Sequence, residues 1–210
     1  MKKTFFLIAI VFISTGTFGQ KKKTSNSTSS VLAKVDNITA QIITDKKVKK
    51  IVLFVKNETS IDTLEVKNNI DTSFKPLNFS LSSITVDNTK LYTLSWNEKK
   101  IITTKMKYEA IDITESQIWN TTTKSLLIGN TQKSIHLKET QYLDKGKTAT
   151  HDVERKRNEG FEFILLPNGD LTLKTKTQEN QYKYSKATDK FENSKVVVAK
   201  SNSSTTKRRR

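Results

Sequence analysis

Short runs in which apolar and polar residues alternate, separated by turn-forming residues, recur along the chain. Successive side chains of a β-strand point to opposite faces, so this alternation predicts strands with one buried face. No stretch carries a long helical repeat of apolar residues. We therefore predict an all-β fold, an antiparallel meander that closes as a barrel or as a two-sheet sandwich.

Two hairpins are predicted from the positions of turn-forming residues. Residues 161–166 alternate before the sequence Pro-Asn-Gly-Asp at 167–170, and a second apolar run follows. The Asn168-Gly169 pair permits the positive φ angles that a tight hairpin turn requires. The other hairpin joins residues 91–96 to residues 101–108, with its turn expected at the polar stretch 97–100.

The segment 31–44 fits two kinds of secondary structure. Val31, Val35, Ile38 and Ile42 would share one face of a helix. Ile38, Ala40 and Ile42 also alternate as in a strand, and the β-branched residues favour a strand in the second half. The fold prediction therefore allows one short N-terminal helix.

The first nineteen residues have the layout of a secretory signal peptide. Lys2 and Lys3 precede a nine-residue apolar run at 5–13, and small residues lead to Gly19. This run is too short to cross a bilayer, which takes about 20 apolar residues. We expect cleavage after Gly19, no remaining transmembrane anchor, and a location in the periplasm or outside the cell. A buried element of the domain is a weaker interpretation, because lysines flank the run on both sides.

These features predict the organisation of the whole chain. We expect a signal peptide at 1–19, a polar linker at 20–30, a single β-rich domain at 31–198 and a disordered basic tail at 199–210. The chain has no cysteine, which excludes disulfides, thiol catalysis, thiolate metal sites and a lipid-modified N-terminal cysteine.

The formal net charge of +16 is concentrated at the two ends of the chain. Residues 31–198 carry 27 basic and all 21 acidic residues, a net charge of only +6. Such a mixed surface makes nucleic acid an improbable partner. The terminal cluster of Lys207, Arg208, Arg209 and Arg210 is a candidate contact for an anionic envelope polymer, although a frayed tail is the simpler interpretation.

Neither histidine is placed for local catalysis. His136 is expected on a solvated strand face, opposite to Glu139. His151 lies beside Asp152 and near Glu154, but an extended chain directs His151 to the other face from both carboxylates. We predict no cofactor and no metal site, and we consider a hydrolase built on His151 the weakest hypothesis.

The leading hypothesis is a non-catalytic exported β-domain that binds a small apolar ligand, a sugar or a polymer. Its candidate ligand-binding residues are four aromatic side chains in predicted strands, with core packing as the alternative role: Tyr92, Trp96, Tyr108 and Trp119. The second hypothesis is a structural or adaptor protein of the cell envelope. That role requires envelope association to depend on residues 201–210.

Overall fold

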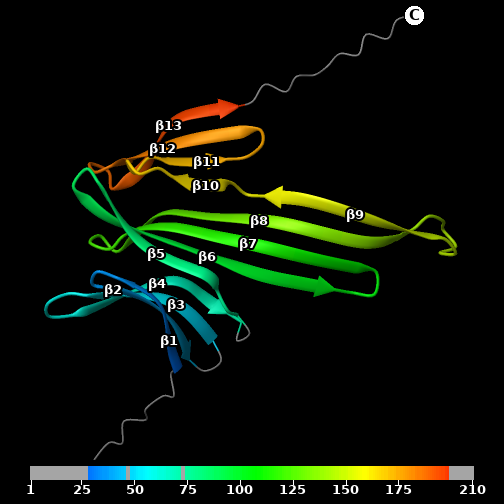
Figure 1. Cartoon of the computed structure of the whole chain (residues 1–210), viewed down its shortest axis with the longest axis horizontal. Coiled ribbons are helices and arrows are strands. Elements are labelled where there is room, and N and C mark those ends of the chain that lie inside the picture. The colour runs from blue at the N-terminus through cyan, green and yellow to red at the C-terminus, as the bar shows by residue number, and fades with distance from the viewer. Residues whose placement is uncertain (1–27, 46–47, 72–73, 199–210) are drawn as a thin grey trace, which may run out of the picture.

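The computed structural model describes residues 28–45, 48–71 and 74–198 (Figure 1). Within these ranges, thirteen strands form three antiparallel sheets, and there is no helix. Strands follow one another in each sheet in the order of the sequence, so every sheet is a meander. The predicted all-β antiparallel architecture is confirmed, and none of the described sheets closes on itself as a barrel.

The first sheet contains β1 (Thr28–Val35), β2 (Ile38–Asp45), β3 (Val48–Lys56) and β4 (Ile61–Ile70). The ambiguous segment 31–44 therefore forms two strands, joined by a turn in which Asp36 has a φ of 52°. Inward-facing Ile38 and Ala40 pair with Val55 and Leu53 of β3, which explains the strand conformation. Strand β1 begins inside the predicted linker, and a helix N-terminal to it would lie outside the described residues.

The central sheet contains β5 (Leu77–Val86), β6 (Thr89–Thr103), β7 (Lys107–Asn120), β8 (Ser125–Tyr142) and β9 (Thr150–Glu159). The distal parts of β6, β7 and β8 project with β9 beyond the other two sheets (Figure 1). We call this projection, residues 98–113 and 133–159, the arm.

The predicted turn at 97–100 is wrong. Strand β6 continues through these residues, and the turn follows Thr103, where the Thr104 amide donates to the Lys107 carbonyl at 2.7 Å. Asn97 pairs with Thr114, and its side-chain amide donates to the Thr114 hydroxyl at 2.9 Å. A polar run does not mark a turn here because the arm is largely solvated.

The third sheet contains β10 (Glu162–Leu165), β11 (Leu171–Lys174), β12 (Gln178–Ser185) and β13 (Lys190–Val198). The hairpin predicted around Asn168-Gly169 is confirmed as β10–β11. Gly169 has a φ of 86°, and the Leu166 amide donates to the Asp170 carbonyl at 2.9 Å. A Cβ at Gly169 would lie 2.2 Å from the Val86 side chain, so this close approach also requires glycine.

Two separate apolar clusters show that the central sheet is buried on both faces. One cluster joins it to the first sheet and includes Tyr92, Leu94, Trp96 and Trp119. The other joins it to the third sheet and consists of Leu91, Ile118, Leu171 and Tyr184, with partly buried neighbours. Consecutive residues of β6 and β7 thus enter opposite clusters. The sheets consequently stack in three layers (Figure 1), where the sequence predicted two sheets or a barrel.

Asp189, in the turn between β12 and β13, fastens the third sheet to the central sheet. Its carboxylate accepts hydrogen bonds from Asn120 Nδ2 at 2.7 Å, Thr123 Oγ1 at 2.6 Å and Tyr184 Oη at 2.8 Å. Burial acts to raise the pKa of Asp189, but hydrogen bonds from Thr123, Asn120, Tyr184 and Ser125 outweigh it, and the pKa lies below the ordinary value.

We expect Asp189→Ala to lower the free energy of unfolding by about 2 kcal/mol at neutral pH, because it leaves Asn120 and Tyr184 without their acceptor. A lowered folded-state pKa contributes stability above the unfolded pKa, and the contribution is lost as pH falls through the folded value. The difference from wild type in urea titrations should therefore shrink below about pH 4. Asp112→Ala, which removes only an exposed pair with Lys99, is the control. Equal losses in both variants would contradict the fastening role.

Candidate ligand groove

The face of the central sheet that looks toward the third sheet changes from apolar to polar along its strands. Thr93, Ile118 and Ile128 lie opposite one another in one row. In the adjoining row, one position on each strand from β5 to β8 carries a short polar side chain, in the order Ser80, Ser95, Ser116 and Asn130. The following row carries Asn97, Thr114 and Gln132.

These short side chains leave a cavity beneath β10. Stacked sheets lie about 10 Å apart, a distance that serine side chains do not fill. Phe163 and Leu165 of β10 form the opposite wall, and the cavity has a volume of ≈ 390 Å³. The Asn130 side-chain amide donates to the Phe161 carbonyl at 2.9 Å, which holds the start of β10 over the polar rows.

A second cavity of ≈ 490 Å³ adjoins the first and shares Gln132 and Glu162 with it. Its remaining lining residues come from the β9–β10 crossing and the β11–β12 turn: Asn158, Gly160, Lys174, Thr175, Lys176 and Thr177. We call the two cavities together the inter-sheet groove. It runs from β5 across β6, β7 and β8 to the end of the third sheet.

The charge of the inter-sheet groove is confined to one end. We call the cavity beneath β10 the inner cavity and the second one the outer cavity. Glu162 is the single ionisable side chain that lines the inner cavity, and Lys174 and Lys176 line the outer cavity. Elsewhere the polar lining consists of hydroxyl and carboxamide groups, which both donate and accept hydrogen bonds. The inner cavity therefore suits a neutral ligand with many hydrogen-bonding groups.

Three of the four predicted ligand-binding aromatics lie on the opposite face of the sheet from the inter-sheet groove. Tyr92, Trp96 and Trp119 are 4%, 0% and 7% exposed, within the cluster shared with the first sheet. The Trp96 indole donates to Glu98 and that of Trp119 to Gln117, each at 2.7 Å. Their observed contacts are those of core packing, and their ligand role stays a prediction.

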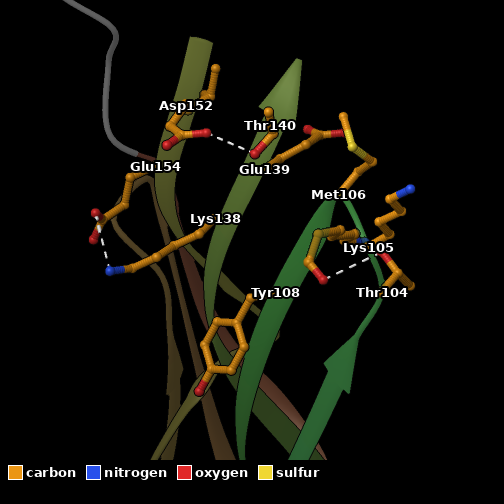
Figure 2. A pocket seen from close by; sticks show the side chains of 11 residues that line it. Thr104, Lys105, Met106, Tyr108, Lys138, Glu139, Thr140, Asp152 and Glu154 are labelled. Atoms are coloured by element: carbon orange, nitrogen blue, oxygen red, sulfur yellow. Dashed lines mark hydrogen bonds and ion pairs between the residues drawn. The ribbon is translucent and has the colours of Figure 1, made fainter. Parts of the chain in front are cut away.

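The fourth aromatic, Tyr108, is 38% exposed and lies far along the arm, apart from the other three. It lines a cavity of ≈ 440 Å³ near the β6–β7 turn (Figure 2). Polar groups there interact with one another: the Thr140 hydroxyl donates to Asp152 at 2.7 Å, and Lys138 lies 3.6 Å from Glu154. This cavity is open and its pairs are exposed, so it offers a ligand less enclosure than the inter-sheet groove.

The two histidines lie on opposite faces of the arm. His136 Nε2 lies 2.5 Å from a Glu154 oxygen, and this hydrogen bond holds the pKa of Glu154 below its ordinary value. His151 is exposed and lies opposite Gln141, on the other face from Asp152 and Glu154. The local constellation that a hydrolase would need is not assembled around His151 in the described part of the chain.

Within the described ranges, no three His, Asp or Glu side chains converge as metal ligands. The described residues also contain no helix long and apolar enough to cross a membrane. Residues 207–210, predicted to contact polyanions, lie outside the described residues.

Sequence reasoning missed the inter-sheet groove because its residues are far apart in the chain. A serine or asparagine in an alternating strand is ordinarily interpreted as solvent-facing, and only the strand register brings Ser80, Ser95, Ser116 and Asn130 into one row. The crossing at Gly160 then places β10 over that row. No protein-family model matches the chain, and no curated protein matches it significantly.

Proposed function

We propose that the protein is an exported, non-catalytic β-protein that binds a polar ligand in the inter-sheet groove. The observation that carries this proposal is the row of four short polar side chains beneath Phe163 and Leu165. Export is supported by the basic start and the short apolar run of residues 1–19.

A purely structural interface would be filled differently. Facing sheets normally interdigitate apolar side chains and pack without sizeable voids. The neighbouring cluster around Leu91, Ile118 and Leu171 follows that pattern. The polar rows depart from it at a position where β10 still covers the sheet. Ser116 is only 4% exposed, yet it lines the cavity, where its hydroxyl can donate or accept a hydrogen bond. A polar ligand can supply hydrogen bonds along the whole row.

The lining chemistry supports binding rather than catalysis. General acid–base chemistry requires positioned ionisable groups within reach of the reacting atoms. The inner cavity has one such side chain, Glu162, so it lacks the second ionisable group that an acid–base pair needs. Hydroxyl and carboxamide groups orient a ligand without transforming it.

The test uses the side-chain amide resonances of Asn130 and Gln132 in NMR spectra of the labelled protein. We expect at least one class in a panel of neutral sugars, nucleosides and short uncharged peptides to shift these signals. Ser95→Leu fills the inner cavity and should weaken that binding by at least about tenfold, or about 1.4 kcal/mol.

Ser134→Leu is the matched control, because Ser134 is exposed on the same face of β8 but lies in the arm. This variant should bind as wild type does. Equal weakening in both variants, or shifts that map only to residues outside the inter-sheet groove, would contradict the proposed site.

A further inference from the structure

We propose that the ligand of the inter-sheet groove is a neutral oligosaccharide that lies across β5, β6, β7 and β8. This inference rests on the proposed function and names its ligand class. Three features of the inter-sheet groove carry it: the spacing of the polar row, the chemistry of the two walls and the fully paired backbone of the floor.

The polar row repeats at the distance between neighbouring strands. Ser80, Ser95, Ser116 and Asn130 stand directly opposite one another, so their spacing is about 4.8 Å, close to the length of one sugar ring in a chain. The four positions span about 14 Å, which accommodates about three rings. The second cavity continues this path past Gln132. The dimensions fit a chain of sugars better than a single one.

The two walls match the two kinds of surface that a sugar ring presents. Hydroxyl and carboxamide side chains on the sheet can donate to and accept from sugar hydroxyls. Phe163 and Leu165 on the other wall are apolar and can cover the C–H face of a ring. The inner cavity is lined by no basic side chain. This disfavours nucleic acids and other polyanions, because their affinity for a protein depends on Lys and Arg.

The backbone of the floor argues against an extended peptide. Peptides that bind to sheets usually add a strand to a free edge and hydrogen-bond through their main chain. In the floor of the inter-sheet groove, Ser95 and Ser116 belong to strands that already have a partner on each side. A ligand there meets side chains only. A bound peptide would also need pockets for every second side chain, and this row of short residues does not form them.

The test is isothermal titration calorimetry of the full-length protein with glucose, N-acetylglucosamine and mannose, each as the monomer and as linear oligomers of two, four and six units. We expect one series to bind, with affinity rising at least tenfold from the dimer to the tetramer. The tetramer should shift the side-chain amide signals of Asn130 and Gln132 in NMR spectra.

Two pairs of variants separate a ligand contact from a change in folding. Gln132→Ala should weaken tetramer binding about fivefold or more, whereas Gln141→Ala, at a half-buried position of the same strand in the arm, should not. Phe163→Leu keeps an apolar side chain but loses the ring, and it should also weaken binding. Leu173 of β11 lies opposite Phe163 but does not line the inner cavity. Leu173→Met should therefore leave binding unchanged.

The outcomes distinguish this inference from the proposed function. If uncharged peptides or nucleosides shift the Asn130 and Gln132 signals and no sugar series does, the ligand class is wrong and the inter-sheet groove remains a binding site. A sugar that binds with no dependence on chain length would also overturn the oligosaccharide assignment. If no member of either panel perturbs these signals, both proposals fail.

Discussion

Replacing Trp96 by alanine is expected to lower the free energy of unfolding by about 4 kcal/mol, the usual range for a fully buried tryptophan. Trp96 is 0% exposed and stacks on Phe79 with 5.9 Å between ring centroids. Its indole nitrogen donates to Glu98, which also pairs with Lys67. Alanine would therefore leave both a cavity and a half-buried carboxylate without one of its donors.

Urea-induced unfolding followed by circular dichroism measures this loss. Tyr142→Ala is the control, because Tyr142 is an aromatic residue of the same sheet that is 46% exposed, and we expect a change within about 0.5 kcal/mol. A Trp96→Ala protein of wild-type stability would show that the cluster between the first and central sheets does not depend on this ring.

Replacing Gly160 by valine is expected to detach the third sheet, with a loss of about 3 kcal/mol or more from strain and collision together. Gly160 has a φ of 78°, and a Cβ there would lie 2.1 Å from the Thr131 carbonyl oxygen. The colliding atom belongs to the backbone of β8, so no side-chain rotation relieves the contact. The chain would have to leave β8 at the point where it crosses from β9 to β10.

Hydrogen exchange can locate this effect, because amides of β10–β13 should lose protection while those of the first sheet keep it. The separation of the two apolar clusters is the reason for this expectation. Gly129→Ala is the control, since a Cβ at Gly129 would lie 3.5 Å from a Leu126 methyl group, an ordinary contact distance. Uniform loss of protection in all three sheets would show that the layers unfold as one unit.

Local features of the sequence predicted much of the strand content. The β10–β11 hairpin follows from Asn168-Gly169 and the alternation around it, because turn chemistry acts over a few residues. The prediction of a turn at 97–100 was wrong for a related reason. Polar residues in a solvated arm resemble turn residues, and only the pairing of β6 with β7 shows that the strand continues through Asn97.

The number of layers and the site depended on contacts that local patterns do not contain. Leu91 and Tyr92 are adjacent apolar residues, which indicates burial on both faces but does not say what covers each one. Aromatic residues were the obvious ligand candidates, yet Trp96 and Trp119 occupy the core. The inter-sheet groove arises where Ser95 and Ser116 meet across strands, and such pairing is decided by the register of the whole sheet.

The sequential order of strands has a consequence for how the chain can fold. Each sheet is complete within one continuous stretch, ending in turn at Ile70, Glu159 and Val198. Short-range pairing favours fast folding, since little loop entropy is lost before contacts form. A chain that emerges with its N-terminus first can complete one sheet before the next sheet appears. No strand has to remain unpaired until a partner from a distant part of the sequence emerges. If the chain is exported as proposed, vectorial folding of this kind would limit aggregation during transit.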